Sequence, residues 1–150
     1  MIFDIEKILS EWEKDSAIGQ DLSEASIHTP LLHAKYLKLY SQAKMKLRLE
    51  ETNQKILLKQ KWLYYAGKMS REEVEATGWE LDPFGGNIKP LKGEMDHYYN
   101  SDSEIITSED KVLYYKNLVD TIKEILDTIK WRHQGIRNAI DFLLSKKFKC

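Results

Sequence analysis

Cysteine, proline and glycine are scarce in this sequence of 150 residues. It has one cysteine, Cys150, with three prolines and seven glycines. A lone thiol cannot form a disulfide within the chain, so we expect a reducing, intracellular compartment. The scarcity of proline and glycine favours long helices over a β-rich design with many tight turns.

Long apolar runs are also absent. The first twelve residues carry Asp4, Glu6, Lys7 and Glu11, so they lack the uninterrupted apolar core of a secretory signal. No apolar stretch reaches the roughly 20 residues that a transmembrane helix needs. We therefore expect a cytoplasmic protein that has no membrane partner.

Motifs for metal binding and catalysis are missing as well. The four histidines (His28, His33, His97 and His133) show no metal-ligand spacing, and Cys150 has no cysteine partner. Gly67-Lys68 lacks the upstream glycine and the following Ser or Thr of a phosphate-binding loop. No nucleophile and base can be paired from the sequence. We predict a protein that is not an enzyme and that holds no cofactor or metal.

The net charge of −1 hides four blocks of alternating sign. Residues 1–29 carry two lysines and seven acids, a net of −5, and residues 30–68 carry nine basic residues and two acids, a net of +7. Residues 69–110 have a net charge of −8, and residues 111–150 a net charge of +5. Such blocks can pair with each other or present a basic surface locally. Both readings stay open for residues 111–150, whereas a binding surface is favoured for residues 30–68.

Helical periodicity and capping signals predict an all-α fold with long helices. The first helix runs from Met1 to about Ser16, and a polar connector follows over residues 19–29. Thr29 as N-cap, Pro30 at the first helical position and Gly67 as a stop predict a basic helix over about 30–66. Ser70 opens a capping box for a short helix that Gly78 closes. Residues 79–107 are predicted to form an irregular loop.

The last helix, predicted over residues 107–150, carries the clearest apolar pattern. Apolar residues recur at alternating steps of four and three, broken only by His133, which we expect to be a polar core position. The seam consists of Tyr115, Val119, Ile122, Leu126, Ile129, Ile136, Ile140 and Leu143. A second stripe, Leu118, Ile125 and Ala139, widens it, and a wide seam suits several neighbours. We predict a coiled-coil-like helix that drives self-association; packing within the monomer is the alternative.

Residues 1–106 contain a basic and aromatic segment that suits single-stranded DNA. Such DNA needs cations that follow the phosphates and flat rings that stack on bases. On a helix, one side carries Lys44, Arg48, Lys55 and Lys59, while Lys61 and Lys68 lie on an adjoining stripe. Tyr64 is a further candidate contact, whereas we expect Trp62 and Tyr65 to turn into the core. A solvated helix face is the alternative to DNA binding.

The order of several motifs resembles the UvsY recombination mediators of tailed phages. The segment Leu58-Lys59-x-Lys61-x-x-Tyr64-Tyr65-x-Gly67-Lys68 is similar to the central motif of that family. Further similar segments are Ala34-Lys35-Tyr36-Leu37, Leu47-x-Leu49-Glu50, Ser101-Asp102 and Gly135-Ile136-Arg137-Asn138-Ala139-Ile140. The likeness covers most of residues 20–148, although residues 78–93 are longer than in some family members.

The resemblance implies an accessory protein of phage recombination, repair and replication, acting in the infected bacterial cell. Its expected partners are single-stranded DNA, the phage single-strand-binding protein, a RecA-like phage recombinase that it helps to load, and other copies of itself. The implied assembly is a closed homo-oligomeric ring, a hexamer or heptamer, held by the helix from about Val112. By position, the DNA-contacting basic pair of the family falls on Lys59 and Lys61. The alternative function is a helical oligomeric adaptor or scaffold that ignores DNA.

Overall fold

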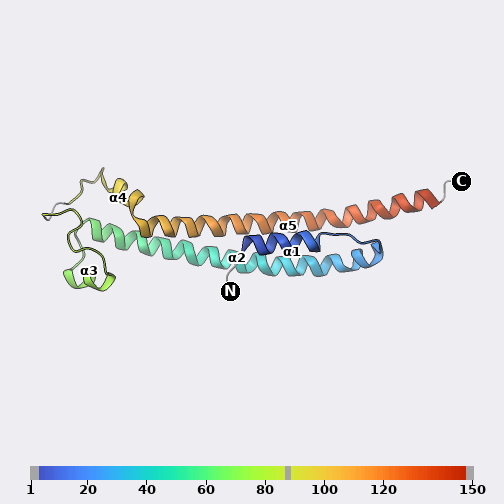
Figure 1. Ribbon diagram of the computed structural model, residues 1–150, viewed down its shortest axis with the longest axis horizontal. Helices are drawn as coiled ribbons and strands as arrows, with labels where there is room; N and C mark the ends of the chain where they lie inside the picture. The colour runs from blue at the N-terminus through green and yellow to red at the C-terminus, as the bar shows by residue number, and fades with distance from the viewer. Residues whose placement is uncertain (1–3, 87–88, 148–150) are drawn as a thin grey trace. The chain divides into compact units, whose positions relative to one another are not determined.

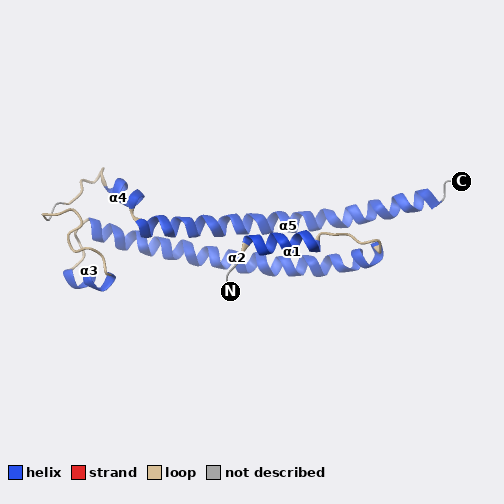
Figure 2. Cartoon of the chain, in the orientation of Figure 1, coloured by secondary structure: helices blue, strands red, loops and turns tan. Residues whose placement is uncertain are grey.

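The computed structural model describes residues 4–86 and 89–147, and over this range its regular elements are all helices (Figure 2). They are α1 (Ile5–Asp15), α2 (Leu22–Tyr65), α3 (Arg71–Thr77), α4 (Met95–Ser101) and α5 (Ser103–Lys147) (Figure 1). The predicted all-α fold is confirmed. Over the described residues, no helix combines the length and apolar character that crossing a lipid bilayer requires.

The chain divides into two compact units, and α2 and α5 each contribute to both. The first unit contains Met1–Leu47 and Tyr115–Cys150, and the second contains Arg48–Tyr114. This division differs from the predicted boundary near residue 106, because the first turns of α5 pack within the second unit. The start of the first predicted helix and Cys150 lie outside the described residues.

Helix α2 begins at Leu22, so the prediction of a connector up to Thr29 is wrong. Asp21 caps the helix: its carboxylate accepts a hydrogen bond from the backbone N–H of Glu24 at 3.0 Å. Pro30 lies inside α2, where proline is unfavourable by about 3 kcal/mol. Ala25 and Thr29 are buried on the preceding turns. Packing of this stretch therefore outweighs the local cost of the proline.

The short helix α3 follows the predicted capping box. The Ser70 hydroxyl accepts a hydrogen bond from the backbone N–H of Glu73 at 3.2 Å. At the other end, Gly78 has φ of 78°, a left-handed conformation that glycine adopts without strain. Both predicted ends of this helix are confirmed.

Part of the predicted irregular loop is helical. Residues 95–101 form α4, and α5 starts at Ser103 rather than near residue 107. The side chain of Asp102 caps α5, because its Oδ1 accepts hydrogen bonds from the backbone N–H groups of Glu104 at 2.9 Å and Ile105 at 3.1 Å. The prediction missed this cap because it placed the helix start near residue 107, five residues after Asp102.

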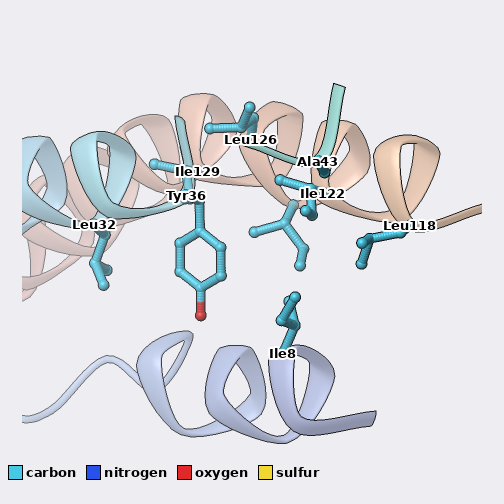
Figure 3. Packing of buried hydrophobic residues seen from close by; sticks show 9 residues of the cluster. Ile8, Leu32, Tyr36, Ala43, Leu118, Ile122, Leu126 and Ile129 are labelled. Carbon is cyan, nitrogen blue, oxygen red and sulfur yellow. The ribbon is translucent and has the colours of Figure 1, made fainter. Parts of the chain in front are cut away.

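Three helices build the core of the first unit (Figure 3). Ile8 of α1 faces apolar side chains of α2 and α5. The buried cluster consists of Ile8, Leu32, Tyr36, Ala43, Leu118, Ile122, Ile125, Leu126 and Ile129. Trp12 adds an edge-on aromatic contact with Tyr36, with ring centroids 5.4 Å apart. The amphipathic faces predicted from sequence thus meet within one chain.

Much of the predicted self-association seam is buried inside the single chain. Ile122, Leu126 and Ile129 pack in the core cluster, Ile136 is buried as well, and Tyr115 and Val119 are partly buried against the cluster. The alternative of packing within the monomer accounts for these positions, because α1 and α2 cover them. Ile140 and Leu143 remain exposed, at 36% and 56%. Self-association stays a prediction that these exposed residues can serve.

Arg132 takes the core position that was predicted for His133, which is exposed. The Arg132 guanidinium donates hydrogen bonds to the backbone carbonyls of Ser16 at 2.7 Å and Ala17 at 3.3 Å. A cation is favourable here because carbonyl groups at the end of a helix, α1, lack partners and carry partial negative charge. The inward-facing polar residue is therefore one position earlier than predicted, and its hydrogen bonds join α5 to the end of α1.

We expect Ile122→Ala to lower the free energy of unfolding by about 3 kcal/mol, because it leaves a cavity in the three-helix core. Ile122 is 0% exposed, whereas Ile56 is 53% exposed. The same substitution at Ile56 should change stability by less than about 0.5 kcal/mol. Urea denaturation followed by circular dichroism measures both, and equal losses would contradict this account of the core.

Candidate nucleic-acid interface

Three exposed cations of the second unit lie on one side of α2. Arg48, Lys55 and Lys59 follow each other at steps of seven and four residues, and all three are exposed. We call these three residues the basic ridge. In the part of the chain that the structure describes, none of the three forms an ion pair with an acid. Their charges are therefore available to an anionic ligand.

Two further predicted contacts are also exposed. Lys68 lies just beyond α2, with its Nζ 4.5 Å from the centroid of the Trp62 ring. Lys44 belongs to the first unit and lies with its Nζ 5.3 Å from the Tyr40 ring. Both side chains remain candidate DNA contacts by their exposure.

Lys61 does not join the basic ridge. Its side chain is buried, and its Nζ lies 3.0 Å from Asp102 Oδ2 and 3.5 Å from Glu104 Oε1. The same nitrogen is 3.9 Å from the centroid of the Trp79 ring. Residues two apart on a helix point to different sides, which explains why Lys59 is exposed while Lys61 is enclosed. The expected phosphate contact through Lys61 is therefore corrected: its ammonium is already committed to acids inside the unit.

The Asp102 carboxylate joins α2 to the start of α5 within the second unit. One oxygen accepts the two backbone hydrogen bonds that cap α5, and the other accepts from the Tyr65 hydroxyl at 2.5 Å and lies by Lys61. Burial by itself would raise the pKa of this carboxyl, but the hydrogen bonds from Tyr65 and Lys61 outweigh it and hold the pKa below its usual range. Asp102 is thus a charged, fully bonded partner for Lys61.

Tyr64, predicted as a DNA contact, is buried as well. Its hydroxyl donates a hydrogen bond to the backbone carbonyl of Glu80 at 2.5 Å, and its ring lies 5.0 Å from those of Tyr65 and Trp79. Burial and the nearby acids Glu80 and Asp102 raise the pKa of Tyr64. The prediction that this ring is open to a ligand is wrong for this conformation, because the ring anchors the segment after α3.

An aromatic cluster extends from Tyr65 into the segment that was predicted as an irregular loop. The ring centroids of Phe84 and Tyr98 lie 5.9 Å and 5.8 Å from that of Tyr65, and 4.5 Å from each other. Pairs at such distances are stabilising by about 1 kcal/mol each. Periodicity could not find these contacts, because the residues are far apart in sequence and most lie outside long helices. The cluster explains how a segment rich in turns holds its place in the second unit.

The side chain of Trp62 faces solvent, contrary to the prediction. The ring was expected in the core, yet it is 42% exposed, next to Lys68 and one helical turn after Lys59. Its neighbours in sequence, Lys61 and Tyr64, take the inner positions instead. The exposed side of α2 thus carries cations and one large aromatic ring together.

Nothing in the described residues resembles a metal centre. Over residues 4–86 and 89–147, no group of three or more His, Cys, Asp or Glu side chains could hold a metal ion. The chemistry that this surface offers is charge and aromatic contact.

Comparison with known proteins supplies a family. A family model described as "Recombination, repair and ssDNA binding protein UvsY" matches residues 11–149. A crystal structure of the bacteriophage T4 recombination mediator protein UvsY, lattice type II, shares the fold with a TM-score of 0.82, 23% identity and coverage of 97% of this chain and 99% of that chain. Lattice type I gives a TM-score of 0.79 at 23% identity, covering 93% and 98%. No match was found among curated proteins.

We expect Lys61→Met to destabilise the second unit by about 3 kcal/mol, because removing one partner of a buried ion pair leaves the other charge uncompensated. Lys59→Met makes the same change on an exposed, unpaired lysine and should cost less than about 0.5 kcal/mol. Chemical denaturation followed by far-ultraviolet circular dichroism compares the two. If the Lys61 variant is as stable as the Lys59 variant, the buried ion pair does not contribute to the free energy of unfolding.

Proposed function

The chain belongs to the UvsY family of recombination, repair and single-stranded-DNA-binding proteins, and from this membership we propose that it binds single-stranded DNA through the basic ridge. The single observation that carries the proposal is the row of exposed, unpaired cations Arg48, Lys55 and Lys59 on one side of α2. A phosphate backbone can follow such a row, and the contact needs no base sequence. Lys68 and Lys44 are proposed as additional phosphate contacts.

A single ridge gives weak binding, so we propose that assembly multiplies it. Each phosphate contact on a single strand contributes a salt dependence of about −0.7 in log affinity against log salt, and three contacts alone bind poorly at cellular salt. Several tethered copies of the ridge act at high effective concentration and gain affinity by avidity. The function therefore depends on a homo-oligomer, proposed as a closed ring of six or seven subunits.

The exposed part of the C-terminal seam is the proposed contact between subunits. Ile140 and Leu143 share one side of α5 with Leu144, which is 48% exposed, while Phe142, 60% exposed, lies on another side of the helix. Clustered apolar side chains in water favour association because burial removes them from solvent. This end of α5 can assemble subunits without disturbing the buried part of the seam.

In recombination, the proposed role is that of a mediator. The oligomer binds single-stranded DNA coated with the phage single-strand-binding protein and reorganises the strand so that a RecA-like recombinase can load. The mediator supplies binding energy and geometry, while nucleotide hydrolysis belongs to the recombinase. A helical adaptor that binds proteins alone is the competing function, and it requires that the purified protein ignore DNA.

Replacing two lysines of the ridge tests the DNA-binding proposal. Lys55→Ala with Lys59→Ala should weaken binding to fluorescent oligothymidine and reduce the salt slope by about 1.4, the share of two phosphate contacts. The control is Lys116→Ala with Lys123→Ala, which removes the same number of exposed lysines from α5, outside the basic ridge. Fluorescence anisotropy across a salt titration measures both. An unchanged slope in the ridge variant would exclude these lysines, and no binding by the unaltered protein would favour the adaptor.

Leu143→Glu tests the assembly proposal. We expect it to reduce the particle mass measured by multi-angle light scattering while far-ultraviolet circular dichroism stays unchanged, because a charge enters an exposed apolar contact. Leu113→Glu is the control, since Leu113 is also on α5 and is 57% exposed, against 56% for Leu143. If the Leu143 variant keeps the native mass, the subunit contact lies elsewhere.

A further inference from the structure

We infer that Trp62 is the residue on which an unpaired nucleobase stacks when single-stranded DNA follows the basic ridge. The inference rests on the proposed DNA-binding function and adds to it a contact with the bases rather than with the phosphates. It also replaces Tyr64, the aromatic contact expected from sequence, by a different residue two positions earlier.

The exposure of Trp62 is the first observation. Tryptophan is usually well buried because its ring carries a large apolar surface. In this chain Trp12 packs on Tyr36, and Trp79 contacts Tyr64 and donates a hydrogen bond from its ring nitrogen to Glu104 at 2.6 Å. Trp62 has neither kind of contact among the described residues and leaves 42% of its surface in solvent. A flat ring in this position is available to a ligand.

The alternatives on the same part of α2 are occupied. The Tyr64 hydroxyl is bonded to the Glu80 carbonyl, and the Tyr65 hydroxyl is bonded to Asp102. Both rings also contact other aromatic side chains. Stacking a base on either ring would require the second unit to open, whereas Trp62 requires no rearrangement.

The charges around the ring decide which ligand fits. Lys68 Nζ lies 4.5 Å from the ring centroid, and Lys59 precedes Trp62 by three residues, which places both on one side of the helix. If an apolar protein surface bound here, it would remove these ammonium groups from water without giving them a partner, which is costly. A single strand presents phosphates to the cations and a flat base to the ring at the same time. Duplex DNA hides its base faces in the stack and can use the cations alone.

The test separates contacts with bases from contacts with phosphates by comparing oligothymidine with an abasic oligomer of the same length. Stacking on one aromatic residue contributes about 1–3 kcal/mol per base, so Trp62→Ala should weaken binding to oligothymidine on the order of tenfold. Binding to the abasic oligomer should change less than about twofold, because the phosphate contacts remain. Trp62→Phe keeps a ring and should recover part of the loss, while Trp62→Leu should behave like Trp62→Ala.

Trp131→Ala is the matched control, because Trp131 is 74% exposed but lies in the first unit on α5. It should leave binding to both oligomers unchanged. Circular dichroism and light scattering of each variant show that fold and assembly are intact before affinities are compared.

Two results would overturn the inference. Unchanged affinity of Trp62→Ala for oligothymidine would mean that no base stacks there. An equal loss on both oligomers, by a folded and assembled variant, would mean that the ring only positions Lys68 for a phosphate. If the unaltered protein binds neither oligomer, the proposed function itself fails, and that outcome is distinct from both.

Discussion

The carboxylate of Asp102 is the group on which the arrangement of residues 48–114 depends. Its two oxygens cap the first turn of α5, accept the Tyr65 hydroxyl and pair with the buried Lys61. A buried carboxylate is costly unless all of its bonding capacity is used, and here both oxygens are used. The end of α2 and the start of α5 are therefore joined by one charged centre, in a unit whose buried apolar side chains include Ile105 and Val112.

This centre sorts the lysines of α2 into two kinds. Lys61 forms ion pairs with the acids Asp102 and Glu104, whereas the charged groups of Arg48, Lys55 and Lys59 face solvent. The acidic block of residues 69–110 thus neutralises only the inner side of the helix. The sequence posed two alternatives, namely that the charge blocks pair with each other or that they present a basic surface. Both occur together, on different sides of one helix. We therefore expect loss of Lys61 to weaken the proposed DNA-binding surface indirectly, through the fold that presents it.

The apolar pattern of α5 is divided in the same way. Its central part packs against α1 and α2, and Arg132 satisfies carbonyls at the end of α1. Ile140 and Leu143 continue the pattern beyond this packing and stay exposed. A single heptad-like repeat therefore contains both the core of one chain and the proposed contact between chains. Periodicity cannot separate the two, since burial within a chain and between chains demand the same apolar side chains.

The sequence by itself determined the all-α class, the ends of α3, the solvent exposure of the spaced cations, and the family, because these follow from local capping, composition and motif order. Tertiary structure alone decided that Pro30 is accommodated inside α2, that Asp102 pairs with Lys61 and Tyr65, and that Lys61 and Tyr64 turn inward while Trp62 turns outward. The physical reason is that each of these outcomes depends on partners distant in sequence. Asp102 lies 37 residues from Tyr65, and Arg132 lies 116 residues from Ser16, so no local pattern could place them together.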